Sequence, residues 1–392
     1  MRKDQCKVVI PVLVLCFLLQ YAFYNIWYNP SQTYDSTTSS PGVTLSVRER
    51  DTNTITVVKQ VISNTNSAVK ATEDDRSRYN IVFYNMPSWM SMEYNTLDSS
   101  RCPHHALKHK CFVYTKNNLY DSSKSVIFFG ENLPARVPKK NEGQIWTFFS
   151  IESPFLYSIP QQWKDKFSWT MTYRRDSDFS YFYGKVNKRE IPLIRNYSEI
   201  FRKKKKTVAW AVSNCKTSSK REDYIQKLQK YIDVDIYGRC GKLKCGRRSA
   251  GVTDCHKKFA EEYKFFLAVE NSICKDYTTE KLFNFFFYNL TMIPIVYGPQ
   301  NVHEYIPKGT FINILDYSSP SELAKDLHRI GSNETLYSEY LREKDKYRGD
   351  RFHWEVALCP MCARLHDRKQ DGKVSIPDIQ SWIWNNTCIK PS

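Results

Sequence analysis

The chain has 392 residues, of which 41% are hydrophobic and 15% aromatic, so it can bury substantial cores and a wholly disordered protein is excluded. Its formal net charge of +17 indicates a polyanionic partner, such as nucleotide phosphates, acidic lipid headgroups or nucleic acid. The densest basic run lies at residues 202–206, and a solvated loop between two domains is its simplest interpretation.

The N-terminal residues predict a membrane anchor. An apolar run at 8–28 has the length of about 20 residues that a helix needs to cross a bilayer. Three basic residues precede this run and should keep the tail, residues 1–7, in the cytosol. A cleaved signal peptide is the alternative, but bulky residues stand where cleavage needs small ones. We therefore expect a single-pass type II protein whose remaining chain is lumenal.

The cysteines and glycosylation sequons fit an oxidising lumen. Twelve cysteines are present; Cys6 and Cys16 lie in or before the anchor, and the others are even in number, which suits disulfide bonds. The pair Cys359 and Cys362 could bind zinc in a cytosolic protein, but structural disulfides suit a lumen better. Sequons agree with that compartment and begin at Asn196, Asn289, Asn333 and Asn385.

Residues 29–78 are rich in Ser, Thr and Asn and predict a flexible stem. A first domain is expected at 79–200, where apolar runs of strand length alternate with turn residues or charges. Continuous apolar runs are typical of strands that are buried on both faces of an α/β sheet. The runs occupy residues 80–84, 111–114, 126–129, 145–149 and 167–173.

Two strand–loop–helix–strand units predict a second domain at 201–355. Their strands are at 207–212, 234–237, 265–269 and 293–297, and their helices are at 221–232 and 281–290. Such units build parallel sheets that bind ligands at the carboxyl ends of their strands. The loops at 213–221 and 270–281 should therefore meet at one cleft. The remaining residues, 356–392, form a C-terminal tail that we expect to pack back on the first domain.

The loop and first helical turn at 270–281 suggest a nucleotide site. A helix N-terminus presents unpaired N–H groups and a positive dipole end, which favour a phosphate. Lys281 adds a positive charge there, Asn271 and Glu280 could hold sugar hydroxyls, and Tyr277 could cover a ring. A capped surface turn with solvated charges is an equally open alternative.

Arg221 repeats this arrangement at the start of the preceding helix. Its guanidinium could donate two hydrogen bonds to a diphosphate. An ordinary exposed arginine is the simpler interpretation of its spacing alone.

Several segments carry a recognisable set of motifs: YKFFLAVENS at 263–272, DYTTEK at 276–281, IPIVYGP at 293–299, WAVSN at 210–214, TYRRDSD at 172–178 and IESP at 151–154. Together, and in their order along the chain, they resemble the motifs of the α1,3-fucosyltransferases, glycosyltransferase family 10. The resemblance runs from about residue 79 to the C-terminus and is closest in character to invertebrate members.

The resemblance implies a fold and an activity. The fold is an α/β architecture of the GT-B kind, in which two Rossmann-like domains face each other across a cleft. The activity is the inverting transfer of L-fucose from GDP-β-L-fucose to the 3-hydroxyl of GlcNAc. Expected acceptors are N-glycans or LacNAc and LacdiNAc antennae on glycoproteins or glycolipids, and the sequence does not choose among them. The family implies a Golgi membrane location, and no nucleic-acid partner is expected.

The resemblance also assigns roles to residues. Glu152 becomes the general base that takes the proton of the acceptor hydroxyl, although a helix-start glutamate before Pro154 is the alternative from the residues alone. The donor contacts carried over are Ser213, Asn214, Arg221, Asn271, Tyr277, Glu280, Lys281 and Tyr183. Arg221 and Lys281 would hold the diphosphate and offset the charge of departing GDP without a metal.

No tightly bound cofactor is expected, and a divalent cation is not required, though one could stimulate the reaction. Asp176 and Asp178 form an Asp-x-Asp sequence like the metal motif of other glycosyltransferases, but in this family it belongs to the acceptor half and is structural.

The family implies that Cys102 and Cys111 pair with Cys359 and Cys362. A second expectation, without family support, is that pairing occurs among Cys240, Cys245, Cys255 and Cys274.

Two other functions remain open. The first is a catalytically inactive membrane-anchored protein that binds glycans or polyanions. The second is a transferase that uses a different sugar nucleotide.

Overall fold

The computed structural model describes residues 79–244, 254–366 and 376–391, all of which belong to one unit of the chain, Val69–Ser392. The expected tail, anchor and stem at 1–78 lie outside the described residues. Among the helices that are described, none is both long enough and apolar enough to cross a bilayer.

A seven-stranded sheet forms the centre of the first lobe, in the order β2-β3-β1-β4-β5-β6-β7. Its strands are β1 (Tyr79–Phe83), β2 (Thr96–Leu97), β3 (Cys111–Tyr114), β4 (Ser125–Phe129), β5 (Ile145–Ser150), β6 (Trp169–Thr172) and β7 (Phe179–Ser180). Neighbouring strands pair in parallel, except that β2 is antiparallel to β3. The central strands β4 and β5 are buried at every position, as their continuous apolar runs predict. The α/β class and the strands expected here are confirmed.

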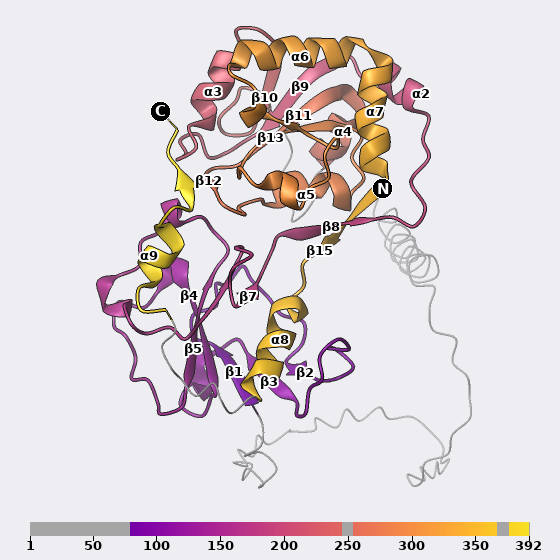
Figure 1. Ribbon diagram of the computed structural model, residues 1–392. Helices are drawn as coiled ribbons and strands as arrows, with labels where there is room; N and C mark the ends of the chain where they lie inside the picture. The colour runs from indigo at the N-terminus through magenta and orange to yellow at the C-terminus, as the bar shows by residue number, and fades with distance from the viewer. Residues whose placement is uncertain (1–78, 245–253, 367–375, 392) are drawn as a thin grey trace, which may run out of the picture. The chain divides into compact units, whose positions relative to one another are not determined.

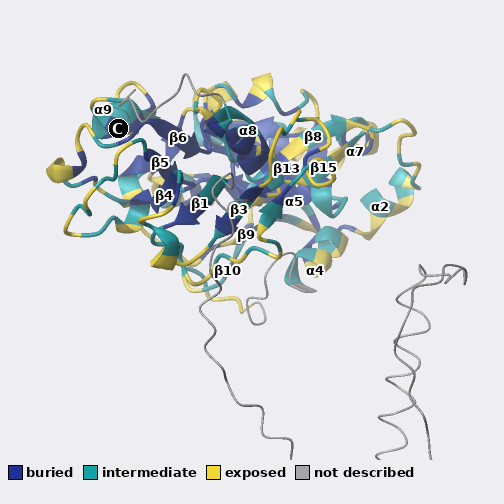
Figure 2. Ribbon diagram, turned by 90° about the horizontal axis from the view of Figure 1, so that it is seen from below, coloured by how far each residue is buried: buried dark blue, intermediate teal, exposed yellow. Residues whose placement is uncertain are grey.

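A parallel five-stranded sheet forms the second lobe, in the order β10-β9-β11-β13-β14. Its strands are β9 (Lys206–Ala211), β10 (Val234–Tyr237), β11 (Tyr263–Val269), β13 (Ile293–Tyr297) and β14 (Ile312–Asn313). The helices of this lobe are α2 (Tyr197–Lys203), α3 (Arg221–Leu228), α4 (Asp254–Glu262), α5 (Glu280–Phe287), α6 (Pro320–Ser332) and α7 (Glu334–Asp345). Figure 2 shows the strands of both sheets mostly in the dark blue of buried residues.

Helix α5 is shorter than the helix expected at 281–290. It ends at Phe287, and Asn289 follows with a positive φ of 52°. Residues 282–286 are all buried, because strands on two sides contact the helix. These are β11 and β13 of the sheet beside it, and the ribbon of β8 (Gly184–Lys188) with β15 (Tyr347–Arg351).

The strand orders place two crevices at the carboxyl edges of the sheets. In the second lobe β9 lies between β10 and β11, and in the first lobe β1 lies between β3 and β4. At such points the connections leave the sheet in opposite directions, which opens a crevice where ligands bind in α/β proteins. The loops after β9, β11 and β5, with the first turn of the helix that follows β9 or β11, carry the predicted site residues except Tyr183, which follows β7.

The C-terminal segments return to both lobes. Helix α8 (Glu355–Leu365) packs on the core of the first lobe beside β1 and β3, and α9 (Ile379–Trp384) packs on its other core (Figure 1). The last strand, β16 (Cys388–Ile389), pairs with β12 (Ile273–Cys274) beside the second lobe. The expected domain boundary at 200 falls inside α2, whose residues pack on the core of the second lobe.

Disulfides fix these returning segments. Cys102 bonds Cys359 and Cys111 bonds Cys362, which confirms the pairing that the family implied. The expected pairing among the later cysteines is wrong for two of them, because Cys240 bonds Cys215 and Cys274 bonds Cys388. Cys255 is also disulfide-bonded, and Cys245 lies outside the described residues.

The basic run at 202–206 is not a solvated loop throughout. Its first residues end α2 and its last begins β9. Lys204 is only 3% exposed, and its ammonium donates to the carbonyls of Ala260 and Tyr263. Burial lowers the pKa of Lys204 to about 7. This lysine therefore helps to join α2 to the end of α4, and it does not contribute to an exposed basic patch.

Candidate active site

A cavity of about 1310 Å³ lies between the carboxyl edges of the two sheets. Residues of both lobes line it, and they include every residue that the sequence assigned to the site: Glu152, Tyr183, Ser213, Asn214, Arg221, Asn271, Tyr277, Glu280 and Lys281. The expectation that the loops after β9 and β11 meet at one cleft is confirmed in the described residues.

Glu152 follows the carboxyl end of β5 and carries the carboxylate that faces the second lobe. The hydroxyl of Tyr277 donates to its Oε2 across the cleft at 2.7 Å. Burial raises the pKa of Glu152, while the hydrogen bond from Tyr277 and the charge of Lys281 act to lower it. A carboxylate with a raised pKa, oriented by a tyrosine, suits a general base. Tyr277, which was expected to cover a ring, lines the cavity with a side chain that is 1% exposed, and its hydroxyl holds Glu152.

The turn around Glu152 is fixed by contacts from both lobes. Ser153 donates to Ser272 at 2.6 Å, and both serines are fully buried. The hydroxyl of Tyr183 donates to the carbonyl of Ile151 at 3.0 Å, so Tyr183 supports the turn of the base in addition to lining the cavity. These contacts leave the backbone of the turn little freedom.

Glu131, which the sequence analysis missed, lies beneath the same turn. It follows β4, the parallel neighbour of β5, so its side chain reaches the end of the adjacent strand. Its Oε1 accepts from the backbone N–H groups of Ile151 and Glu152 at 3.2 and 3.0 Å and from the hydroxyl of Ser150 at 2.9 Å. No local sequence pattern marks such a residue, because its partners are about twenty positions away.

Lys281 is the second residue of α5, as expected, but it already has an anionic partner. Its ammonium lies 2.9 Å from Oε2 of Glu270, a carboxylate that is 2% exposed, and 3.5 Å from Oε1 of Glu280. Glu270 also accepts from the backbone N–H and the hydroxyl of Thr279, the N-cap of α5. The lysine at the helix start thus does not by itself demand a ligand, because Glu270 balances its charge.

Arg221 is the first residue of α3 and is 4% exposed, so the interpretation as an ordinary exposed arginine is wrong. Its two terminal nitrogens donate to the carbonyls of Val269 and Asn214 at 2.6 and 3.2 Å. The guanidinium therefore ties the ends of β9 and β11 together beside the cavity. Its Nε and the Oδ1 of Asn271 are buried without a hydrogen-bond partner. Unsatisfied buried polar atoms are unusual, and functional sites are one place where they occur.

The loop after β9 is the most open part of the donor side. Ser213 and Asn214 are exposed there, and the next residue, Cys215, is bonded to Cys240. Arg239, which follows β10, donates from Nε to the carbonyl of Ser213 at 2.8 Å and lines the cavity.

Several other lining residues were missed from the sequence: Trp89, Arg239, His256, Arg351 and Phe352. The sequence could have indicated Arg239, because this residue follows Gly238 at the carboxyl end of a predicted strand. Trp89 follows β1 and is 66% exposed, with its ring edge-on to that of Phe129 at 6.2 Å. An exposed tryptophan in a loop has no sequence signature that separates it from a core residue.

Two groups of side chains that could bind a metal have other partners, and the first is the Asp-x-Asp sequence. Asp176 accepts from Arg174 at 2.6 and 2.8 Å and lies 3.3 Å from the ammonium of Lys275. Asp178 accepts from Thr170 and from Arg364. These contacts agree with a structural Asp-x-Asp sequence.

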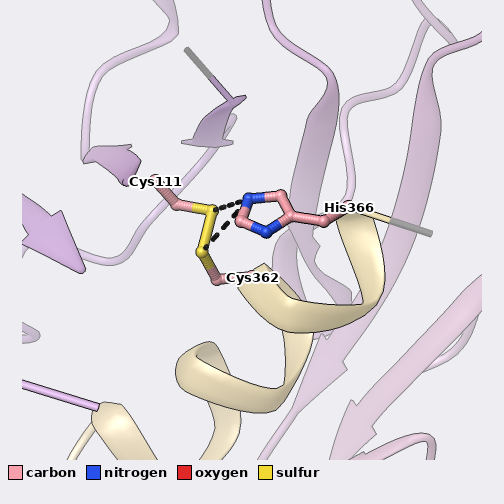
Figure 3. Close-up of side chains that lie close together, drawn as sticks. All are labelled: Cys111, Cys362 and His366. Atoms are coloured by element: carbon pink, nitrogen blue, oxygen red, sulfur yellow. Dashed lines mark hydrogen bonds between the residues drawn. A yellow bond between two sulfur atoms is a disulfide. The ribbon is translucent and has the colours of Figure 1, made fainter. Parts of the chain in front are cut away.

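The second group is Cys111, Cys362 and His366, the one set of clustered potential ligands found among the described residues. Figure 3 shows the two sulfurs joined in a disulfide beside the ring of His366. Nε2 of His366 lies 3.8 Å from Sγ of Cys111 and 4.0 Å from Sγ of Cys362. Metal ligation needs thiolates, which a disulfide does not offer.

Comparison with known proteins identifies the family. Residues 76–184 match the model for the fucosyltransferase N-terminal region, and residues 201–382 match the model for the C-terminal region of glycosyltransferase family 10 (fucosyltransferase). The chain is also 33% identical over 290 residues to 4-galactosyl-N-acetylglucosaminide 3-alpha-L-fucosyltransferase 9 of Cricetulus griseus, covering 70% of this chain and 75% of that protein. The chain belongs to glycosyltransferase family 10.

The share of the other protein that is covered differs among the similar proteins. Glycoprotein 3-alpha-L-fucosyltransferase A of Drosophila melanogaster is 34% identical over 293 residues, which are 70% of this chain and 56% of the fly protein. The matched region thus spans little more than half of that relative. A crystal structure of an α1,3-fucosyltransferase with GDP superimposes with a TM-score of 0.49 at 15% identity, over 78% of this chain and 96% of that chain.

Proposed function

We propose that this family 10 member is an inverting α1,3-fucosyltransferase that moves L-fucose from GDP-β-L-fucose to the 3-hydroxyl of GlcNAc. The observation that carries the proposal is the pairing of Glu152 with Tyr277 across the cavity, at 2.7 Å. This pairing places the carboxylate of Glu152, whose pKa is raised, opposite the start of α5, which carries the ammonium of Lys281. The names of the relatives support the same transfer.

In the proposed reaction the carboxylate of Glu152 takes the proton of the acceptor hydroxyl as the hydroxyl oxygen attacks C1 of fucose. The bond from C1 to the phosphate oxygen breaks, and GDP leaves with the electron pair. Tyr277 holds Oε2 of the carboxylate and so orients the base. Lys281 and the N-terminus of α5 stabilise the charge that develops on the diphosphate.

Lys281 exchanges partners in this proposal. Its ammonium is bound to Glu270 before the donor arrives, and Glu270 retains the N–H and hydroxyl of Thr279 when the lysine turns to phosphate. Arg221, bound to two carbonyls, keeps the loop after β9 in place and adds positive potential from beneath the cavity. In this proposal the positive charges of Lys281 and Arg221 offset the charge of the diphosphate, so that the donor binds without a required metal.

For the acceptor we propose that Trp89 forms the platform on which a sugar ring stacks. The indole is 66% exposed and lines the same cavity as Glu152. An exposed aromatic face can cover the apolar face of a pyranose. The relatives' names mention both glycoprotein and galactosyl-N-acetylglucosaminide substrates, so glycans with GlcNAc on glycoproteins or glycolipids are the proposed class.

We also propose that the protein is a type II Golgi membrane protein with its enzymatic part in the lumen. The apolar run at 8–28 supports an anchor, and the disulfides favour an oxidising compartment. The sequon residues Asn196, Asn333 and Asn385 are exposed, whereas the amide of Asn289 accepts from Arg189 at 2.6 Å. Protease protection in sealed microsomes tests the orientation: cleavage from the cytosolic side should remove at most the short tail.

The test of function is transfer by the full-length protein with GDP-fucose and a GlcNAc-containing glycan array, beside a panel of other sugar nucleotides. Glu152→Gln should lose transfer by about 100-fold or more while GDP affinity is kept. An inactive glycan-binding protein would bind the array without releasing GDP. Preference for another donor in the panel would replace the assignment of fucose.

A further inference from the structure

We propose that Glu131 is a positioning residue that fixes the turn carrying the general base. This inference rests on the proposed role of Glu152 and extends it to a residue that does not line the cavity. It concerns the backbone of the turn, whose placement decides where the carboxylate of Glu152 lies.

The geometry concentrates three hydrogen bonds on one oxygen. Oε1 of Glu131 accepts from the N–H groups of two consecutive residues, Ile151 and Glu152, and from the hydroxyl of Ser150. These three residues end β5 and begin the turn, so a single carboxylate oxygen defines its direction. The hydroxyl of Tyr157 donates to Ser150 at 2.9 Å and extends this network to the far side of the turn.

The hydrogen bonds between the side chain of Glu131 and the turn all involve Oε1. Oε2 of Glu131 is buried and has no hydrogen-bond partner. Burial raises the pKa of Glu131 to about 7, and the donors on Oε1 act against this rise. When the side chain is protonated on Oε2, Oε1 still accepts from the backbone, so the turn is held in both protonation states. The acceptor oxygen, and not the charge, is therefore the positioning element.

The backbone at the end of β4 packs closely against β5 just before Glu131. A Cβ on the preceding residue, Gly130, would lie 2.3 Å from the ring of Phe148 on β5. The glycine lets the backbone pass against that ring, and the next side chain is then directed over the end of the neighbouring strand. The base turn is thus held from its own sheet by Glu131 and from the other lobe by Tyr277 and Ser272.

The test compares Glu131→Ala, Glu131→Gln and Glu131→Asp in the full-length protein. Loss of the acceptor in Glu131→Ala should lower kcat by about 10- to 100-fold, since a displacement of the order of 1 Å has such effects, with KM for GDP-fucose within about twofold. Glu131→Gln keeps an acceptor oxygen and needs no charge, so it should retain activity within about fivefold. Glu131→Asp is shorter and should resemble the alanine variant although it keeps the charge.

A second readout does not depend on activity. Amide hydrogen exchange of the peptide around residues 150–157 should be faster in Glu131→Ala and close to wild type in Glu131→Gln. The matched control is Glu322→Ala, which removes a carboxylate that likewise accepts from a backbone N–H and a serine hydroxyl, but in α6 of the second lobe and not beneath the base turn. It should leave both kcat and exchange in this peptide unchanged.

The outcomes separate the positioning role of Glu131 from the proposed fucosyltransferase function. Unchanged exchange in Glu131→Ala would overturn the positioning role whatever the enzyme does. Equal inactivity of the Gln and Ala variants would overturn it too, because it would require the carboxyl group itself in the reaction. If Glu131→Ala does not fold, the Asp and Gln variants decide by the same comparison. If Glu131→Ala exchanges faster than the wild type but the wild-type protein transfers no fucose, the result would count against the proposed function alone.

Discussion

The hydroxyl of Tyr277 donates to Oε2 of Glu152 at 2.7 Å, although the two residues are 125 positions apart and belong to different lobes. This contact joins the proposed base to the loop that precedes α5, where the donor diphosphate is expected. The orientation of the base therefore depends on how the second lobe is placed against the first.

The pH dependence of transfer should respond to this bond. Activity requires ionised Glu152 and is lost as the pH falls through its pKa, which burial raises and Tyr277 lowers. Tyr277→Phe removes the lowering contribution, so the pKa of Glu152 should rise further and the acidic limb of kcat/KM should move to higher pH. Rate–pH profiles measure the shift. Tyr173→Phe is the control, because its ring lies 4.9 Å from that of Tyr277 and its hydroxyl has no hydrogen-bond partner. An unshifted limb in Tyr277→Phe would contradict the assignment of Glu152.

The ion pair of Lys281 with Glu270 predicts an effect on stability. Lys281→Met leaves a carboxylate that is 2% exposed without its cation, which should lower the free energy of unfolding by about 2 kcal/mol, less than for a fully buried pair because Lys281 is 29% exposed. Adding Glu270→Gln should restore part of this loss, and denaturant unfolding of the single and double variants measures the coupling. GDP affinity should stay reduced in the double variant. Additive losses of stability would show that the pair is not coupled.

Trp89 predicts a selective effect on the acceptor. Trp89→Ala should raise KM for the glycan by about tenfold, the order expected from lost ring stacking, and Trp89→Phe should raise it less. GDP affinity measured by calorimetry should not change, because all but one of the residues proposed to contact the donor lie in the second lobe. Ile194→Ala is a matched control, since Ile194 is 94% exposed and does not line the cavity. An equal rise of KM for donor and acceptor would argue against a platform for the acceptor alone.

The two disulfides of α8 predict non-additive stability. Cys102–Cys359 and Cys111–Cys362 close nearly the same loop, with sequence separations of 257 and 251. When one bond remains, the other closes only about a dozen residues, so removing either alone by Cys→Ser should cost about 3 kcal/mol on loop-closure entropy. Removing both opens the long loop and should cost about 8 kcal/mol, more than twice the single loss. Denaturant unfolding of the two single-bond variants and the double variant tests this, and a simply additive result would contradict it.

The sequence predicted the features that local patterns encode. Continuous apolar runs gave the parallel strands of both sheets, and the positions of β10 and β13 agree with the predicted residues. The strand ends then brought all the assigned site residues to one cavity, because carboxyl ends of parallel strands meet at the same edge. The helix expected at 281–290 was too long, since α5 ends at Phe287 and Asn289 has a positive φ.

By itself, the sequence of this chain determined which segments become strands and which loops face the cleft, since both follow from short-range periodicity and from strand direction. Only the tertiary structure decided the partners of the charged and polar side chains: Glu131 with the turn of the base, Glu270 with Lys281, Tyr277 with Glu152, and Cys215 with Cys240. The two residues of each pair are not neighbours in the sequence. Their contacts depend on where the strands lie in each sheet and on how the two lobes meet, and no local pattern of residues carries that information.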